Sequence, residues 1–456
     1  MSRNRWVLSE SRFLRYLTFG LFYVSQGVPA GVTIIGIPAW AAAKGASSTT
    51  VASLVAAAYL VPSFKFMLGP IVDRYTFPAM GRRRPWLIGA QTVMTLAWIA
   101  ASILAPGPTD TSLLVMVTFM VSGATAVQDV AADALSVDLL QDGEEGPASA
   151  FMFGGALISM AASGALSGYL LQHYGSSIAF LAFLPVIALV TLYAVTILER
   201  PGERRLPWSK GEESAIDKEV QAERWWPILR ESIVNLLTRD SLIFIAVSLA
   251  AGLAAGLVTP LWTLFATTRA GFDAAGYTAL NSAINLPTTF ACVALGGALN
   301  PRFGVRAVVA TVLLLDAAMY LGMWFDTGLF ALTSAFIAIN VATAITATLR
   351  QIGQQALRID LSSSRVGATQ MTIYNSLGNL TISTGAGLFA ALGGMAALGL
   401  NLAATIAVSA LAAILTLFLR IGGRAPKADG IKAARVPTRR RRSRPAGRRD
   451  TRPPGA

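Results

Sequence analysis

The chain has 456 residues, of which 54% are hydrophobic and only 13% are charged. About a quarter of the residues of a soluble protein are charged, so this composition argues against a water-soluble enzyme. The length suits a membrane protein of about a dozen spans, at ~20 apolar residues each. The net charge of +13 lies mostly in residues 420–456, which hold thirteen Lys/Arg and two Asp. The rest of the chain is therefore close to neutral.

Two residue types that often build reactive sites occur once each, as Cys292 and His173. A single cysteine excludes an intrachain disulfide, and a single histidine excludes a multi-histidine metal site. We see no catalytic arrangement and no phosphate-binding loop of the G-x-x-x-x-G-K-[ST] type. The sequence therefore predicts neither an enzyme nor a cofactor or metal site, and it does not support transport driven by ATP.

Apolar stretches follow one another in two sets of six, separated by a polar segment. Helices are the expected spanning form, because barrel strands would be short and alternating in polarity. The first stretch is too long for the core of a cleavable signal peptide and is expected to span the membrane. The predicted spans are Leu17–Trp40, Val51–Val72, Trp86–Leu104, Ser112–Leu140, Ala148–Leu171, Ile178–Ile197, Leu242–Ala266, Ala275–Leu299, Ala307–Phe325, Leu329–Leu357, Gly367–Leu392 and Ala396–Leu419.

The basic residues predict the orientation of these spans. Of 37 Lys and Arg, 34 fall in the termini and the loops that share their side, whereas Lys44 and Arg269 fall on the other side and Lys65 lies within a span. Basic residues favour the cytoplasmic side, so we expect both termini in the cytoplasm and a bacterial inner-membrane location. The predicted parts are a cytoplasmic N-terminal tail (1–16), a six-helix bundle (17–198), a cytoplasmic linker (199–240), a second six-helix bundle (241–419) and a basic tail (420–456).

The basic tail and the linker have distinct expected roles. The tail has the composition of a disordered segment, and its arginine run is expected to bind anionic lipid, although a topogenic or merely solvated role stays open. No aromatic or folded reader accompanies it, so we expect no nucleic-acid partner. Within the linker, Trp225 and Trp226 are candidates for the membrane interface.

Related loops occur in the two halves of the chain. The loop after the second span begins with Gly69, Asp73 and Arg74, and the loop after the eighth has Gly296, Asn300 and Arg302 at nearly the same spacing. Repeated halves are a common plan of secondary transporters, which place the substrate site between them.

Twelve spans with Gly-x-x-x-Asp-Arg and Gly-Arg-Arg between the second and third resemble the major facilitator superfamily. Residues 20–31 (GLFYVSQGVPAG), 63–87 (SFKFMLGPIVDRYTFPAMGRRRPWL) and 128–140 (QDVAADALSVDLL) are similar to the AmpG-type muropeptide-permease and acetyl-coenzyme A transporter group. The resemblance implies an all-α 6+6 fold that transports a small molecule by alternating access. It also implies that a loop motif stabilises the cytoplasmic gate: Gly69, Asp73, Arg74, Gly81, Arg82 and Arg83. For Arg84, topogenic charge is a sufficient explanation.

Three of the charged residues inside predicted spans form one candidate cluster. Asp129 and Asp133 share a helix face at a spacing of four, and Lys65 lies at about the same depth, near 25 Å from the outer end at ~1.5 Å per residue. A charge inside a membrane is costly and usually faces a partner or a cavity. Two interpretations stay open: an ion pair that only holds two helices together, or a proton-coupling or substrate site with a spare carboxyl. Asp138 lies nearer the interface and is expected to be structural.

Polar residues near the end of the tenth span are candidate substrate ligands. Arg350, Gln351 and Gln354 suit an anionic or sugar-like ligand, although a helix end that snorkels into the interface would look the same. We expect Asp316 in the ninth span to be isolated and structural. Further candidate lining residues, each of which also suits helix packing, are Tyr23, Gln26, Gln128, Trp262 and Tyr374.

The sequence thus predicts a monomeric secondary transporter of the inner membrane, with protons as the coupling ion. The first substrate hypothesis is an anhydro-muropeptide or a similar amphiphilic sugar-peptide, and acetyl-coenzyme A or a siderophore is the alternative. A rival from another class is a non-transporting assembly or signalling factor on the same fold.

Overall fold

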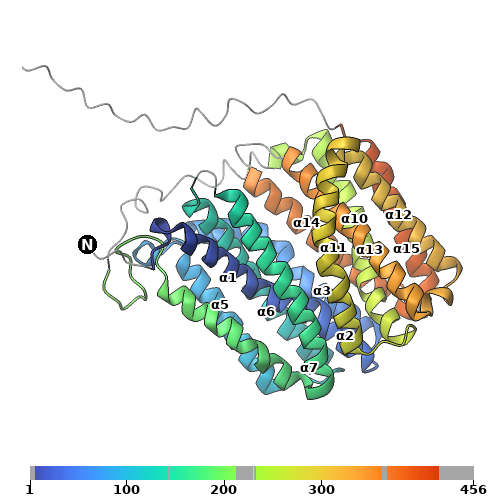
Figure 1. Ribbon diagram of the computed structural model, residues 1–456, viewed down its shortest axis with the longest axis horizontal. Helices are drawn as coiled ribbons and strands as arrows, with labels where there is room; N and C mark the ends of the chain where they lie inside the picture. The colour runs from blue at the N-terminus through green and yellow to red at the C-terminus, as the bar shows by residue number, and fades with distance from the viewer. Residues whose placement is uncertain (1–5, 142–143, 212–229, 231–232, 362–366, 421–456) are drawn as a thin grey trace, which may run out of the picture. The chain divides into compact units, whose positions relative to one another are not determined.

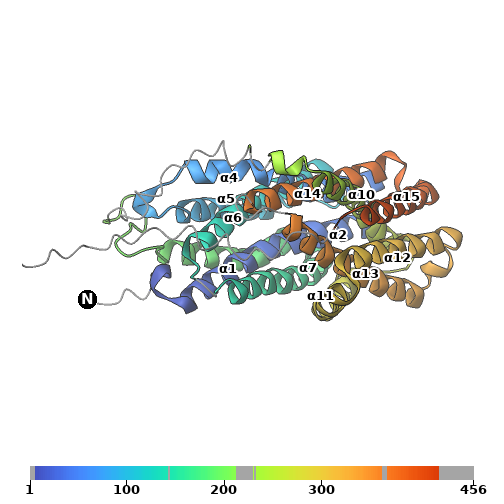
Figure 2. The same ribbon diagram turned by 90° about the horizontal axis from the view of Figure 1, so that it is seen from above.

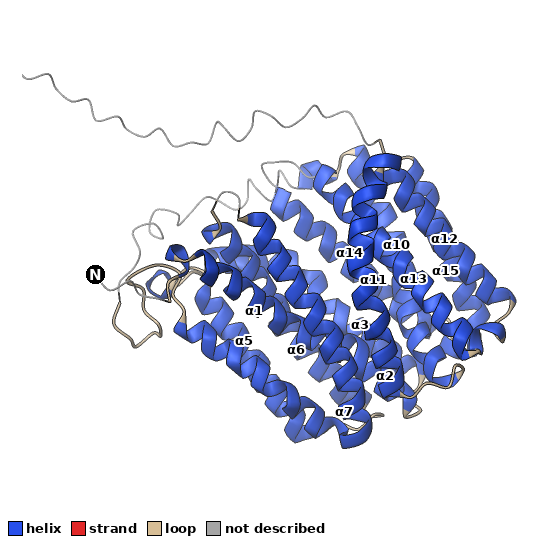
Figure 3. Cartoon of the chain, viewed as in Figure 1, coloured by secondary structure: helices blue, strands red, loops and turns tan. Residues whose placement is uncertain are grey.

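The computed structural model describes residues 6–141, 144–211, 230, 233–361 and 367–420. Helices and their connections account for these residues, and no β-strand occurs among them (Figure 3). Their one isolated β-bridge joins Val7 to Leu198. The basic tail from residue 421 onward, and the linker tryptophans Trp225 and Trp226, lie outside the described residues.

Helices form all six predicted spans of the first half. Gly175, with φ 81° and ψ 177°, breaks the helical path of α7 and divides it into the fifth and sixth spans. The first two spans are each built of consecutive helical segments. The elements are α1 (Arg12–Ala30) with a π-helical turn (Gly31–Gly36) and α2 (Ile37–Ala43); α3 (Ser48–Leu60) with a 3₁₀ turn (Val61–Phe64) and α4 (Lys65–Arg74); α5 (Arg84–Leu104); α6 (Thr111–Leu139); and α7 (Glu145–Thr196).

The second half repeats the pattern with one helix for each span. These helices are α10 (Arg239–Thr268), α11 (Ala274–Phe303), α12 (Val305–Phe325), α13 (Thr333–Leu361), α14 (Gly367–Ala391) and α15 (Leu398–Leu417).

Twelve spans follow from these elements. Ten stretches of the described chain are long and apolar enough to cross a membrane, and one of them, residues 151–196, is divided at Gly175. Helix α14 is not among the ten, but it packs along α10 and α3 as a further full-length helix. The predicted all-α membrane fold with twelve helices in a 6+6 arrangement is confirmed.

The first helix begins earlier than its apolar run. The hydroxyl of Ser11 accepts a hydrogen bond from the backbone N–H of Leu14 at 3.3 Å, so α1 starts at Arg12 rather than Leu17. Such a cap satisfies a donor that would otherwise be unpaired at the helix start. The segment before it is also ordered, because the backbone N–H of Leu8 donates to the carbonyl of Leu198 at 2.9 Å. Part of the predicted N-terminal tail is therefore packed structure.

The two halves lie side by side in one compact unit, which spans residues 1–420 (Figure 1). Helix α7 of the first half packs along α11 of the second, and α3 packs along α14; α7 and α11 are also neighbours in the view of Figure 2. The approach of α7 to α11 is close: a Cβ on Gly168 would lie 2.0 Å from the hydroxyl oxygen of Thr278, so only glycine leaves room there.

Hydrogen bonds also join the two halves across this junction. The backbone N–H of Ala275 donates to the side-chain oxygen of Gln172 at 3.1 Å, and the Gln172 amide donates to Asp273 at 2.6 Å. Ser282 donates to the carbonyl of Ala161 at 2.7 Å. A similar bond joins Ser383 to Ala56 at 2.9 Å, and the N–H of Met395 donates to Ser48 at 3.2 Å. These contacts join the two halves at their junction.

Candidate functional site

A charged cluster lies inside the first half, where α1, α4 and α6 meet. The Asp129 carboxylate on α6 forms an ion pair with Lys65 at the start of α4 and accepts a hydrogen bond from Gln26 on α1. The Asp129 side chain is 13% exposed and that of Lys65 is 22% exposed. The structure therefore brings together Lys65 and Asp129, which the sequence placed at equal depth, and adds Gln26 as a second donor.

Asp133 lies one turn further along α6 and has a different partner. The hydroxyl of Tyr23 on α1 donates to Asp133 Oδ1 at 2.5 Å. Asp133 is exposed although it belongs to a spanning helix, whereas Asp129 is only partly exposed. The ion pair with Lys65 thus accounts for one of the two carboxylates, and a neutral hydroxyl holds the other.

Gln128 lies behind this cluster rather than at its surface. Its side chain donates to the carbonyl of Phe22 at 2.6 Å and accepts from Gln91 at 2.9 Å, and Gln91 also donates to Ser25 at 2.7 Å. Gln128 is 1% exposed. This network fixes α1 against α5 and α6, so Gln128 holds the backbone that carries Tyr23.

A second intramembrane ion pair lies in the other half, where α12 meets α13. Arg350 Nη1 lies 4.0 Å from Asp316 Oδ2, and the hydroxyl of Thr346 donates to Asp316 Oδ1. Arg350 Nη1 also donates to the carbonyl of Ala251 on α10 at 3.4 Å. The expectation that Asp316 is isolated is wrong, because the partner lies on the next helix and spacing within one span cannot reveal it. Arg350 lies inside α13, within the tenth span as the sequence predicted.

The amides that follow Arg350 on α13 differ in exposure. Gln351 is exposed, whereas Gln354 is 9% exposed and its amide nitrogen has no hydrogen-bond partner among the described residues. Arg358, further along the same helix, donates to Asn375 on α14. Sequence reasoning missed the pairing of Arg358, although a second arginine at a spacing of eight from Arg350 was a signal for it.

Two aromatic candidates are packed inside the second half. Trp262 is 8% exposed and its ring lies 5.8 Å from that of Phe336. Tyr374 is 2% exposed and packs edge-on against Phe244 at 5.2 Å. This placement favours the packing interpretation that the sequence left open for both.

The loop motif after the second span holds α6 as well as α5. Arg83 Nε donates to Asp138 Oδ2 at 2.9 Å, and Arg82 Nη1 lies 3.6 Å from the same oxygen. Asp138 is therefore paired with the loop motif, which suits the structural role expected of it. Asp73 and Arg74 end α4, and their side chains are not among those that the structure describes.

Glu199, which the sequence placed at the start of the linker, contacts the loop motif. Its buried carboxylate accepts from the backbone N–H groups of Arg82, Arg83 and Arg84 at 3.0, 2.8 and 2.5 Å. A carboxylate at a helix start satisfies unpaired donors and suits the helix dipole. Gly81 has φ 96°, and a Cβ there would lie 2.7 Å from the Glu199 carboxyl group.

Arg84 is a structural residue rather than a topogenic charge only. It is fully buried, and its guanidinium donates to the carbonyls of Met80, Ala194 and Arg204 at 2.9, 3.1 and 2.8 Å. A buried cation is tolerated when all its hydrogen-bond donors are used. The three carbonyls that accept from Arg84 come from three separate segments of the chain. Arg84 thereby ties the start of α5 to the end of α7.

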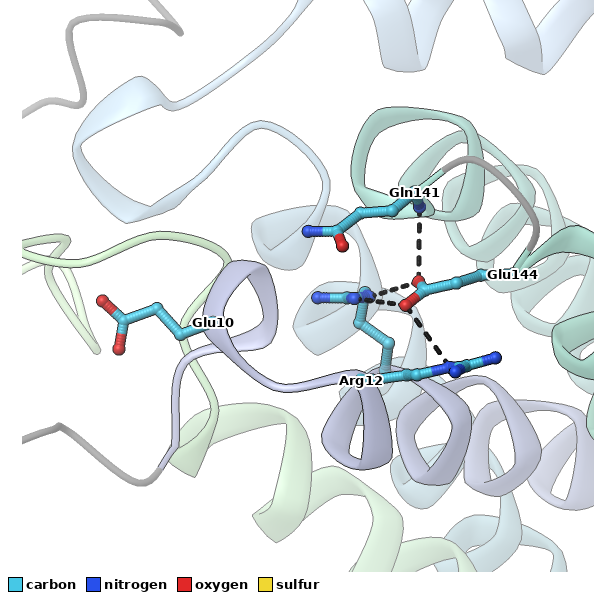
Figure 4. A pocket seen from close by; sticks show the side chains of 5 residues that line it. Glu10, Arg12, Gln141 and Glu144 are labelled. Carbon is cyan, nitrogen blue, oxygen red and sulfur yellow. Dashed lines mark hydrogen bonds and ion pairs between the residues drawn. The ribbon is translucent and has the colours of Figure 1, made fainter.

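A pocket of about 350 Å³ near the start of α1 is lined by Glu10, Arg12, Arg15, Gln141 and Glu144. Figure 4 shows how these side chains lie. Arg15 forms a two-point ion pair with Glu144, at 2.8 Å through Nε and 2.6 Å through Nη2. These bonds, with those from the Gln141 backbone and the nearby charge of Arg12, lower the pKa of Glu144. Since Arg15 also donates to the carbonyls of Leu8 and Ser9, the pair joins the N-terminal segment to the start of α7.

No three His, Cys, Asp or Glu lie close enough together, among the residues that the structure describes, to hold a metal ion. The fold and the buried charges together define a multi-pass membrane transporter. The sequence model of the Major Facilitator Superfamily matches residues 17–386, and the chain belongs to that family.

A sequence relative agrees with this class, and solved structures agree with the fold. The chain is 25% identical over 363 residues to the anhydromuropeptide permease of Escherichia coli (strain K12), a match that covers 77% of this chain and 69% of the relative. The fold is similar to that of the nucleoside transporter NupG, with a TM-score of 0.64, 12% identity, and 88% of this chain and 97% of that chain covered. A POT family transporter in complex with a thioalcohol-conjugated peptide gives 0.61 at 13% identity, over 88% of this chain and 94% of that chain.

Proposed function

We propose that this protein imports an anhydro-muropeptide, or a similar amphiphilic sugar-peptide, across the bacterial inner membrane together with protons. Transport would proceed by alternating access, in which the two six-helix halves rock around a site between them. The sequence relative in Escherichia coli supports the substrate class, and the resemblance of residues 20–31, 63–87 and 128–140 supports the same group.

One observation carries the coupling part of the proposal: Lys65 pairs with Asp129, so Asp133 is left without a cation of its own. Asp133 is exposed, and the Tyr23 hydroxyl can hydrogen-bond to it in either protonation state. A carboxyl that is exposed on a spanning helix, and is not neutralised by a salt bridge, is suited to take up and release a proton. We assign the coupling role to Asp133 and a positioning role to Asp129 and Lys65.

The loop motif is proposed to stabilise the cytoplasmic gate while the outer side is open. Arg82 and Arg83 bind Asp138 at the end of α6, so they connect α5 to the helix that carries Asp133. Gly69, Asp73 and Arg74 would complete this gate from α4. Both termini are proposed to lie in the cytoplasm, because basic residues gather on that side.

Uptake by the purified protein in liposomes tests this function. Labelled anhydro-muropeptide, acetyl-coenzyme A and a siderophore are offered separately, with and without a proton gradient directed inward. We expect accumulation of the muropeptide alone, and only with the gradient. Accumulation of one of the other two would reassign the substrate, whereas uptake of none would favour a non-transporting role for this fold.

A further inference from the structure

Arg350 uses less of its hydrogen-bonding capacity than the buried Arg15 and Arg84 do. Arg15 and Arg84 are 2% and 0% exposed, and each donates through Nε, Nη1 and Nη2. The Arg350 side chain is 11% exposed, and Nη1 alone makes contacts, both of them long: 3.4 Å to a carbonyl and 4.0 Å to Asp316. Its Nε and Nη2 donate to none of the described residues.

The unused donors form the planar fork that binds a carboxylate at two points. The contact that Arg350 does make with Asp316 is much longer than the 2.6 Å of the Arg15–Glu144 pair, so its geometry is that of a loose counter-ion. Asp316 also accepts from the hydroxyl of Thr346. Because of that second bond, Asp316 keeps a hydrogen-bond partner when Arg350 turns away.

A further unpaired donor lies one turn from Arg350 on the same helix. The amide nitrogen of Gln354 is buried and has no hydrogen-bond partner among the described residues. A buried donor without a partner destabilises the folded protein, because its desolvation is not offset by a hydrogen bond. Gln351, next to Arg350, is exposed, so this part of α13 is reached from outside the helix packing. The two unsatisfied donors and the exposed amide point to a ligand that carries hydrogen-bond acceptors.

We propose that Asp316 is a displaceable counter-ion. It neutralises Arg350 in the empty transporter, and a carboxylate group of the substrate replaces it as the partner of Arg350 when the substrate binds. This inference rests on the proposed function, since it names the group of the solute that α13 recognises. A single carboxylate matches the single charge that Asp316 gives up, whereas a phosphate dianion would leave a negative charge uncompensated at membrane depth. Arg350 and Gln354 then contact the substrate, and Asp316 is a positioning residue.

The test compares anhydro-muropeptide with the same compound after its carboxyl groups are converted to amides. The full-length protein in liposomes gives KM and Vmax for uptake of each, and the shift in Tm of the purified protein reports binding without transport. The variants are Arg350→Gln and Asp316→Asn, with Glu144→Gln as a matched control, because it breaks a buried pair whose arginine has no unused donor group.

We expect Arg350→Gln to raise KM for the carboxylate compound about tenfold or more, since a charge-assisted bond is lost, and to leave KM for the amide unchanged. Asp316→Asn should lower KM for the carboxylate compound about threefold while also lowering Vmax, because nothing recaptures Arg350 when the substrate leaves. Glu144→Gln should affect both compounds equally.

Equal changes in KM for the two compounds in Arg350→Gln, or an unchanged KM in Asp316→Asn, would overturn the inference while uptake by the wild type still supports the proposed function. If the wild type neither transports nor is stabilised by either compound, the proposed function and the inference fail together. Should a single variant fail to insert, the double variant Asp316→Asn/Arg350→Gln removes both charges. It must then no longer distinguish the carboxylate from the amide, and discrimination by it would contradict the inference.

Discussion

Lys65 of α4 forms an ion pair with Asp129 of α6, one helical turn before an exposed Asp133 that is held by a tyrosine. A lone charge inside a membrane protein is the costly state, because its desolvation is no longer offset by a partner. We therefore expect the pair to have a structural role whatever the cycle requires of its neighbour. That role and the coupling role proposed for Asp133 can be separated by mutation, because they are assigned to different carboxylates.

Replacing one member of this pair should destabilise the protein more than replacing both. We expect Lys65→Met and Asp129→Asn each to lose about 3 kcal/mol or more, whereas the double variant recovers most of it, because no unpaired charge remains. Heat-induced unfolding of the purified variants, followed by tryptophan fluorescence, gives the comparison. A double variant that is less stable than either single one would contradict the pairing.

Substitution by alanine should lower the stability of the protein at one glycine of the loop motif but not at another. Gly81→Ala should cost about 1–3 kcal/mol, because Gly81 has a positive φ and its Cβ would press on Glu199. Gly69→Ala serves as the matched control, since a Cβ there meets nothing within 4 Å, and its Tm should not fall. Equal Tm values for the two variants would show that the Glu199 cap does not constrain this loop.

The Arg15–Glu144 pair should make stability depend on pH in the acid range. The pKa of Glu144 is lowered in the folded protein, so the pair contributes stability above the ordinary glutamate value of 4.5, and the contribution is lost as pH falls through the lowered pKa. We expect Tm of the wild type to fall over that window more steeply than Tm of Glu144→Gln. Parallel pH profiles would mean that this pair is not formed in solution.

Much of the fold was readable from the sequence, because each span needs its own run of apolar residues. The ion pair of Lys65 with Asp129 was also predicted as an option, since both residues lie at the same depth. Contacts between separate segments were not readable. Glu199 looked like the start of a linker and Asp316 looked isolated, because their partners, the N–H groups of α5 and the side chain of Arg350, come from other parts of the chain.

Positive charge alone also misled the interpretation of one arginine. Topogenic charge was taken as a sufficient explanation for Arg84, but Arg84 is fully buried. A count of basic residues predicts which side of the membrane a loop occupies, but it does not say which arginines have buried partners. Hydrogen-bond partners of that kind depend on helix packing.

The basic tail is expected to act on lipid rather than on transport. Deleting residues 425–456 removes much of the positive charge but none of the spans. We expect near-normal uptake rates, and weaker binding of the tail peptide to vesicles that contain anionic lipid as salt is raised. Loss of uptake by a correctly inserted truncation would assign the tail a direct part in the cycle.

The most direct test of the account is a comparison of two transport modes in Asp133→Asn. Proton-driven accumulation of labelled anhydro-muropeptide needs a group that binds and releases a proton, whereas exchange of labelled for unlabelled substrate needs only the substrate site. Asp110→Asn, in the loop before the same helix, is the control. The account predicts that Asp133→Asn abolishes accumulation and retains exchange, while Asp110→Asn retains both. Full proton-driven accumulation by Asp133→Asn at matched protein levels would contradict it.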